Sequence, residues 1–101
     1  LIEHVENTIK EIEEITGLPF EYEVDKAADI VDKYMGAGWS CNTSESENEV
    51  LEFVRTEGIY IENVYTSKLM YGYKDMVKNH LVDGDSAVIH TGGFGSLFSQ
   101  Y

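Results

Sequence analysis

The chain has 101 residues, a length that allows one domain at most and only a modest core. Its hydrophobic content of 43% favours folding over disorder, and no apolar run approaches the roughly 20 residues that cross a membrane. Nineteen acidic residues against seven basic ones give a formal net charge of −12. Electrostatic repulsion therefore disfavours nucleic acid and anionic membrane surfaces as partners.

Cysteine and histidine usage narrows the chemistry further. The single cysteine, Cys41, excludes an intrachain disulfide, and His4, His80 and His90 lack the spacing of metal ligands. The acidic, amphipathic start carries no signal-peptide pattern and no initiator Met. We expect a cytoplasmic protein from which something upstream has been removed.

The first half of the chain predicts one helix and one short strand. Apolar residues recur every three or four positions over residues 1–16, and Gly17 is placed to cap that helix. Residues 20–24 alternate weakly and suit a strand or a loop. The apolar pair within residues 27–35 predicts a short strand that opens into the glycine-bearing loop Gly36-Ala37-Gly38-Trp39.

The second half predicts two further helices, each followed by a strand. Ser44 and Glu47 have capping-box spacing for a helix that ends at Gly58. A strand is expected over residues 59–61, then a helix capped by Thr66 or Ser67 that ends before Asp83, then a strand over residues 87–89. The residues expected to face the core from these helices are Val50, Leu51, Val54, Leu69, Met70, Tyr73, Met76 and Val77.

This alternation predicts an α/β fold with parallel strands and a terminal helix. Three strands make only a fragment of such a sheet. A parallel sheet must also be covered on both faces, and the few helices of this chain would cover it poorly. We therefore expect at least one sheet edge to meet protein that is absent from this chain.

The turn Thr91-Gly92-Gly93-Phe94-Gly95 follows the last predicted strand. Glycine lets the backbone take positive φ and approach a flat or anionic group, and Thr91 can donate or accept one hydrogen bond. Ligands of parallel sheets bind beyond the carboxyl ends of the strands, which is where this turn would lie. The alternative is a turn that only reverses the chain.

Three motifs occur in a familiar order: the loop that ends in Trp39, the stretch Val64-Tyr65-Thr66-Ser67-Lys68, and His90-Thr91-Gly92-Gly93. Together they resemble the C-terminal part of the fold type II pyridoxal-phosphate enzymes that include D-cysteine desulfhydrase and 1-aminocyclopropane-1-carboxylate deaminase. The resemblance implies that residues 1–101 are a partial C-terminal α/β segment of the large cofactor-binding domain, of the tryptophan synthase beta-like type.

The resemblance also implies the roles of individual residues. Tyr65 would lie beside the ring of pyridoxal 5'-phosphate and take part in substrate or proton handling, and Thr66 would also bind the cofactor. Thr91 would lie near the pyridine nitrogen, and Gly92 and Gly93 would let the backbone pass close to the ring. The lysine that binds the cofactor would lie outside this chain, with Lys68 only flanking a helix.

The pair Thr66 and Thr91 resembles the desulfhydrase-like branch, because the cyclopropane-opening deaminases typically have glutamate and leucine there. Trp39 stands where both branches usually place an active-site tyrosine, and an indole offers only an N–H donor. We therefore expect Trp39 to contact the substrate.

The predicted function is part of a lyase or deaminase that removes the α-proton of a small amino acid, with D-cysteine favoured, and yields a keto acid, ammonia and sulfide. The missing N-terminal portion is the expected partner, with a homodimer implied by the resemblance. One alternative is a non-catalytic relative that serves as a structural or interaction fragment. Another is a small phosphate-binding α/β module that uses the glycine turn directly.

Overall fold

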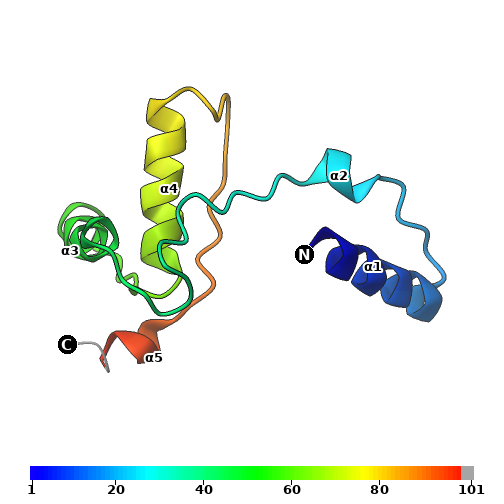
Figure 1. The fold of residues 1–101 in the computed structure, drawn as a ribbon, viewed down its shortest axis with the longest axis horizontal. Helices are drawn as coiled ribbons and strands as arrows, with labels where there is room; N and C mark the ends of the chain where they lie inside the picture. The colour runs from blue at the N-terminus through cyan, green and yellow to red at the C-terminus, as the bar shows by residue number, and fades with distance from the viewer. Residues whose placement is uncertain (99–101) are drawn as a thin grey trace. The chain divides into compact units, whose positions relative to one another are not determined.

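The computed structural model describes residues 1–98; residues 99–101, the end of the glycine-bearing tail, lie outside the described residues. The elements follow in the order α1 (Ile2–Thr16), α2 (Val24–Ala27), α3 (Ser44–Glu57), α4 (Thr66–Lys78) and α5 (Phe94–Leu97) (Figure 1). The chain divides into two compact units, residues 1–31 and residues from 32 onward. Each unit is described by itself below.

The first unit holds α1 and α2. Gly17 ends α1 as predicted, with φ at 70° and its N–H donating to the Glu13 carbonyl at 2.8 Å. Of the stretch 20–24, residues 20–23 are a loop that leads into α2, which begins at Val24. No residue of α1 is buried, and Ile12 and Ile15 are 52% and 84% exposed. The helix predicted from the sequence is confirmed, whereas its apolar stripe stays largely open within this unit.

Helix α3 opens the larger unit's helical pair. Its N-cap is Thr43, whose hydroxyl accepts from the Ser46 N–H at 3.1 Å while the Ser46 hydroxyl accepts from the Thr43 N–H at 3.0 Å. The capping box therefore lies one residue before the predicted pair, Ser44 and Glu47. The two hydroxyl side chains of Thr43 and Ser46 satisfy the two amides in place of a hydroxyl and a carboxylate. Gly58 ends the helix with φ at 70°, as predicted.

Helix α4 begins at Thr66 and uses no capping side chain from its N-cap, Tyr65. The predicted helix is confirmed. Of the residues expected to face the core, Met70 packs against Val50 and Ile61, and Tyr73 and Met76 are partly buried. Leu69 and Val77 are instead 44% and 42% exposed, and Gly72 is buried. A Cβ on Gly72 would lie 2.8 Å from the ring of Tyr34. The ring of Tyr34 therefore lies directly against the backbone of α4.

The core between α3 and α4 is small and partly polar. Val50 and Ile61 are 4% and 2% exposed, with Phe53 and Met70 packed against them. Leu51, predicted to be buried, is 45% exposed. The polar side chains buried in this unit are Ser46, Glu49, Glu62, Asn63, Thr66, Ser67 and Lys68. In Figure 1, α3 crosses beside α4. The two helices are joined by an ion pair between Lys74 of α4 and Glu49 of α3, with Nζ and Oε2 3.0 Å apart.

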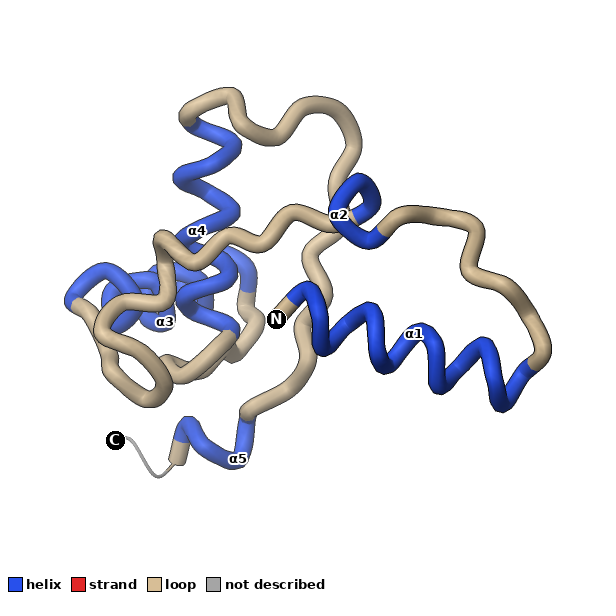
Figure 2. Tube along the Cα trace, turned by 45° about the vertical axis from the view of Figure 1, so that its right-hand side comes forward, coloured by secondary structure: helices blue, strands red, loops and turns tan. Residues whose placement is uncertain are grey.

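Within residues 1–98 the segments 28–35, 59–61 and 87–89 are loops and not the parallel strands predicted from their apolar residues (Figure 2). Ala27, where the first of these strands was predicted to begin, is the last residue of α2. A strand requires a ladder of backbone hydrogen bonds to a neighbour. His90, the residue after the segment 87–89, contacts the segment 59–61 through its side chain: its Nε2 lies 2.9 Å from the Tyr60 carbonyl oxygen. The α/β sheet is thus not confirmed, and the helical chain is compatible with a segment of a larger fold.

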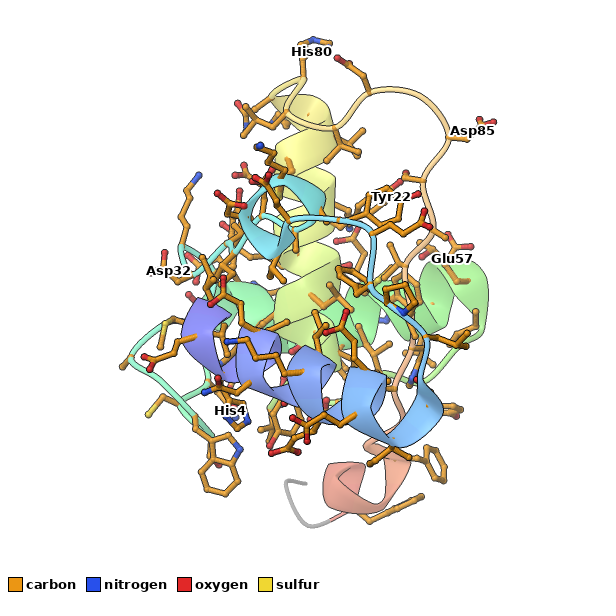
Figure 3. The ribbon with its side chains drawn as sticks, turned by 90° about the vertical axis from the view of Figure 1, so that its right-hand side faces the viewer. His4, Tyr22, Asp32, Glu57, His80 and Asp85 are labelled. Atoms are coloured by element: carbon orange, nitrogen blue, oxygen red, sulfur yellow. The ribbon has the colours of Figure 1, made fainter. Side chains whose placement is uncertain are left out.

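After α4 the chain turns back along that helix. His80 and Asp85 mark this return loop in Figure 3, and the Tyr73 hydroxyl lies 2.7 Å from the Ser86 hydroxyl. The return leads to α5, the predicted terminal helix, where the ring of Phe94 meets that of Tyr60 edge to face at 5.8 Å. None of the described helices is long and apolar enough to cross a bilayer.

Candidate functional site

The start of α4 is organised by the carboxylate of Glu62, which is 1% exposed. One of its oxygens accepts from the Val64 N–H at 2.6 Å. The other accepts from the N–H groups of Tyr65 and Thr66 at 2.9 and 2.8 Å and from the Thr66 hydroxyl at 3.1 Å. Glu62 therefore satisfies amides at the helix start that would otherwise lack partners.

These donors determine the charge state of Glu62. Burial alone would raise the pKa of its carboxyl, but hydrogen bonds from the amides of Thr66, Val64 and Tyr65 and from the Thr66 hydroxyl outweigh it. The net pKa of Glu62 lies below its ordinary value of 4.5. A negative charge is thus held at the positive end of the α4 dipole.

The glycine turn lies against the same carboxylate. A Cβ on Gly93 would overlap Cγ of Glu62 and lie 2.9 Å from its carboxyl carbon. Gly92 and Gly93 have φ of 104° and 93°, in the region that favours glycine. Glycine at position 93 is therefore required both by the backbone conformation and by the contact with Glu62.

The loop that carries Trp39 is tied to α4 by Lys68. The Lys68 ammonium donates to the carbonyl oxygens of Met35 and Gly38, both at 2.9 Å. Gly38 and Ser40, the neighbours of Trp39, both have positive φ, at 122° and 58°. The predicted glycine-bearing loop is thus confirmed as a sharply turned segment whose end faces the start of α4.

Trp39 and Tyr65 meet directly. The Trp39 indole N–H donates to the Tyr65 hydroxyl oxygen at 2.5 Å. The two side chains are 75% and 57% exposed, so both can be reached from solvent. An indole N–H can only donate, which leaves the hydrogen of the Tyr65 hydroxyl available to donate elsewhere.

His90 shapes the approach to the glycine turn. Its Nδ1 accepts from the Gly92 N–H at 3.1 Å, and its Nε2 faces the Tyr60 carbonyl oxygen. Only the neutral tautomer with the proton on Nε2 satisfies both contacts. The side chain of Thr91, next to His90, is exposed.

The structure brings most of the predicted site residues to one end of α4. Trp39 and Tyr65 are in contact, and Gly93 reaches the carboxylate that caps Tyr65. Thr66 is 2% exposed and its hydroxyl is engaged with Glu62, which gives it a role in starting the helix. The cofactor roles implied for Tyr65, Thr66, Thr91, Gly92 and Gly93, and the substrate contact of Trp39, stay predictions.

Sequence reasoning missed Glu62, which it assigned to an ordinary loop. The available signal was an acidic residue four positions before Thr66, at the expected start of a helix. Acidic side chains are favoured there by the exposed amides and the helix dipole. Lys68 was expected to flank a helix, and the structure adds its contacts with Met35 and Gly38.

The donor set at this end of α4 fits a flat, uncharged aromatic ring better than a free anion. The amides at the start of the helix are already bonded to Glu62, and its negative charge lies against the glycine turn. A Cβ on Gly92 would meet nothing within 4 Å, so its surroundings are open. This arrangement counts against the phosphate-binding module and suits a pyridine ring approached by neutral hydroxyl groups.

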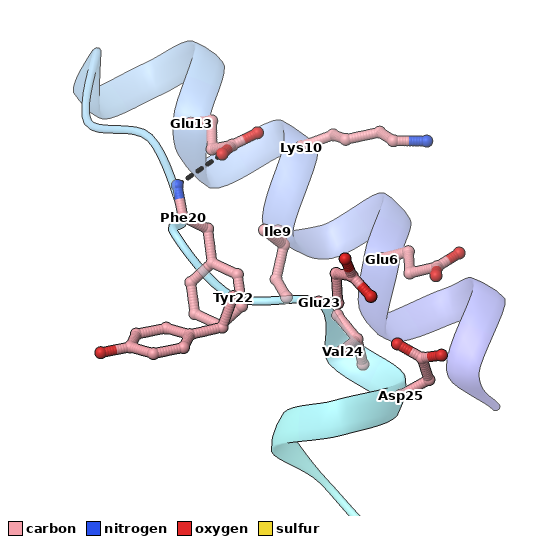
Figure 4. Close-up of a pocket in the computed structure, with 9 residues that line it drawn as sticks. All are labelled: Glu6, Ile9, Lys10, Glu13, Phe20, Tyr22, Glu23, Val24 and Asp25. Carbon is pink, nitrogen blue, oxygen red and sulfur yellow. Dashed lines mark hydrogen bonds between the residues drawn. The ribbon is translucent and has the colours of Figure 1, made fainter.

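The first unit contains a pocket that none of the predicted site residues lines. This pocket of about 470 Å³ is lined by four acidic residues, one lysine and four apolar or aromatic residues (Figure 4): Glu6, Ile9, Lys10, Glu13, Phe20, Tyr22, Glu23, Val24 and Asp25. The Phe20 N–H donates to the Glu13 carboxylate at its edge. Across residues 1–98, no group of three or more histidine, cysteine, aspartate or glutamate residues is placed to hold a metal ion.

Comparison with known proteins finds similar sequences among the curated proteins. Over 72 residues the chain is 36% identical to a protein of Thermotoga maritima named "Putative 1-aminocyclopropane-1-carboxylate deaminase". The match covers 71% of this chain and 22% of that protein, so the chain spans about a fifth of the length of this curated relative. No family model and no solved structure matches the chain. The similarity supports a relationship to the enzyme family indicated by the three motifs.

Proposed function

We propose that the chain is part of a pyridoxal-phosphate-dependent lyase or deaminase that acts on a small amino acid. The observation that carries this proposal is the meeting of three separate motifs at the start of α4: Trp39 contacts Tyr65, and Gly93 contacts the carboxylate that holds Tyr65. The 36% identity to a protein with a deaminase name supports the same reading. The rest of the proposed enzyme would supply the lysine that binds the cofactor.

Pyridoxal phosphate, when bound, supplies an electron sink that makes the α-proton of an amino acid removable. In this proposal Thr91 would hold the ring nitrogen by a neutral hydrogen bond, and Gly92 and Gly93 would give the backbone room beside the ring. Tyr65 holds or moves a proton at its hydroxyl, whose orientation is constrained by the Trp39 N–H. Trp39, which is largely exposed, forms part of the surface that the substrate side chain meets.

The favoured reaction is β-elimination from D-cysteine. Removal of the α-proton lets the sulfur leave from Cβ, and one water is consumed to give a keto acid, ammonia and hydrogen sulfide. A neutral partner at the ring nitrogen makes a moderate electron sink, which suffices when a good leaving group departs from Cβ. Thr66 and Thr91, which resemble the desulfhydrase-like branch, favour this reaction over opening of a cyclopropane ring.

The test is a substrate screen of the full-length protein with added pyridoxal phosphate. We expect the visible absorbance of lysine-bound cofactor, and release of sulfide and ammonia from D-cysteine. Tyr65→Phe should lower kcat by a hundredfold or so, within the range of general acid–base effects. Tyr71→Phe is the matched control: Tyr71 is half-buried, its ring meets that of Tyr34 edge to face, and loss of its hydroxyl should leave kcat within twofold.

A non-catalytic relative is the second candidate, and Trp39 is the observation that favours it. Its indole N–H donates to the hydroxyl oxygen of Tyr65. An indole cannot act as a general acid or base, whereas the hydroxyl of a tyrosine at this position could. Trp39→Tyr decides between the two: activity that appears only in this variant assigns the natural protein a structural or interaction role. A protein that binds no cofactor and releases neither sulfide nor ammonia would contradict the enzyme proposal. A homodimer in the cytoplasm is part of the same proposal.

A further inference from the structure

Glu62 lies where two of the three motifs meet. Its carboxylate accepts from the amides of Val64, Tyr65 and Thr66, and the aliphatic part of its side chain lies under Gly93. Its own N–H donates to the Thr66 hydroxyl at 2.9 Å, and its carbonyl accepts from the Ser67 N–H at 2.9 Å. One buried residue is therefore bonded through its amide, carbonyl and side chain to the segment that carries Tyr65.

Tyr65 depends on this support because its own side chain is exposed. Within the described residues 1–98, its hydroxyl is held by Trp39, which is itself 75% exposed. Its backbone, by contrast, is held from below by a fully buried carboxylate at 2.9 Å. The position of the phenol is thus determined mainly by the backbone of Tyr65, which Glu62 holds.

We infer that Glu62 is a positioning residue, which holds the phenol of Tyr65 and the Thr91–Gly93 turn in register with each other. This inference rests on the proposed function, in which those two groups act on the same cofactor and substrate. Glu62 does not touch the reacting atoms; it acts through the backbone of Tyr65 and through van der Waals contact with Gly93. A glutamate reaches both because one oxygen serves Val64 while the other serves Tyr65 and Thr66.

The variant that tests the inference is Glu62→Gln, which keeps the shape of the side chain. Its single amide oxygen can face either the Val64 N–H or the N–H groups of Tyr65 and Thr66, so at least one amide must face another donor. We expect kcat on the proposed substrate to fall tenfold or more while KM changes less than threefold, because misplaced reacting groups lose rate more than binding. Glu62→Asp, which keeps the charge, should recover part of the kcat.

The matched control is Glu49→Gln. Glu49 is 4% exposed in the same unit, and both of its oxygens accept from the Lys74 ammonium, at 3.1 and 3.0 Å. It therefore loses a buried ionic hydrogen bond without touching Tyr65 or the glycine turn. We expect this variant to be destabilised while its kcat stays within twofold of the natural protein. An equal fall in kcat in both variants would assign Glu62 a purely structural role and overturn the inference.

Amide hydrogen exchange of the full-length protein gives a readout that does not depend on turnover. Glu62→Gln should speed exchange at Val64, Tyr65 and Thr66 and also at Gly92 and Gly93, whereas Glu49→Gln should speed neither group. Acceleration confined to residues 64–66 would show that Glu62 does not link the two motifs. If the natural protein has no activity, the proposed function fails, and the exchange data alone decide whether Glu62 holds the two segments together.

Discussion

The two units differ in how they use their side chains. The larger unit buries a polar network, with Glu62, Thr66 and Lys68 all at most 9% exposed. Among the side chains of this unit that the structure describes, the buried apolar ones are Val50 and Ile61. The smaller unit buries nothing, although α1 carries a clear apolar stripe. Hydrophobic periodicity alone therefore does not create a core. A core in this chain forms where buried hydrogen-bonding groups find partners on neighbouring segments.

The largest loss of stability is expected in the larger unit, from Gly93→Ala. The new Cβ would overlap the side chain of Glu62 and force a positive-φ position onto a residue that disfavours it. Together these effects should cost about 3 kcal/mol or more of unfolding free energy in the larger unit. The measurement is chemical denaturation of the 101-residue chain followed by circular dichroism.

Gly92→Ala is the control for Gly93→Ala. Its φ is also positive, at 104°, but its Cβ would meet nothing within 4 Å. It should therefore show only the conformational cost, about 1 kcal/mol. Equal losses for the two variants would mean that the contact with Glu62 does not constrain the turn.

The apolar residues of the two units should differ next most. Val50→Ala removes methyl groups that are 4% exposed beside Ile61 and should cost about 2 kcal/mol. Ile15→Ala removes a larger group that is 84% exposed and should change stability by less than about 0.5 kcal/mol. A large loss for Ile15→Ala would show that α1 buries its stripe in the protein in solution.

Gly72→Ala should have a smaller effect, limited to the face of α4 beneath Tyr34. The Cβ would lie 2.8 and 2.9 Å from two atoms of that ring, so the ring must shift. Alanine also favours the helix, which offsets part of the cost and leaves a net loss of about 1 kcal/mol. Thermal denaturation checks this, with Gly95→Ala as the control, because a Cβ on Gly95 would meet nothing within 4 Å.

The smallest expected effect is the pH dependence that Glu62 adds. The pKa of Glu62 in the folded protein lies below 4.5, its ordinary value in an unfolded chain. Its charged form therefore stabilises the fold at pH values above the pKa of the unfolded chain. This contribution is lost as the pH falls from about 4.5 through the folded pKa. The difference in unfolding free energy between the natural chain and Glu62→Gln should therefore shrink on acidification below about pH 4.5. A difference that stays constant down to about pH 3 would contradict the charged state assigned to Glu62.

The helices were largely predictable, because their signals are local. The stripe in residues 1–16 with Gly17, and the stop at Gly58, follow from helical periodicity and from the ease with which glycine adopts left-handed φ. The three predicted strands are not confirmed in the described residues, because a short apolar run does not specify its hydrogen-bonding partner. The expected core face of α4 was right at Met70 but wrong at Leu69 and Val77. The ring of Tyr34, 38 positions away from Gly72, covers that glycine, which has no apolar side chain to signal the contact.

The sequence by itself determined the chain's acidity, its three long helices, the positions of its glycine turns and the three motifs that predict a pyridoxal-phosphate enzyme. Only the tertiary structure decided that Trp39 contacts Tyr65, that Lys68 holds the glycine-bearing loop, and that Glu62 connects the start of α4 to Gly93. Helix caps and turns depend on neighbours a few residues away, so their signals survive in the sequence. Contacts across about 30 residues depend on how the whole unit packs, and a single sequence carries no local signal for them.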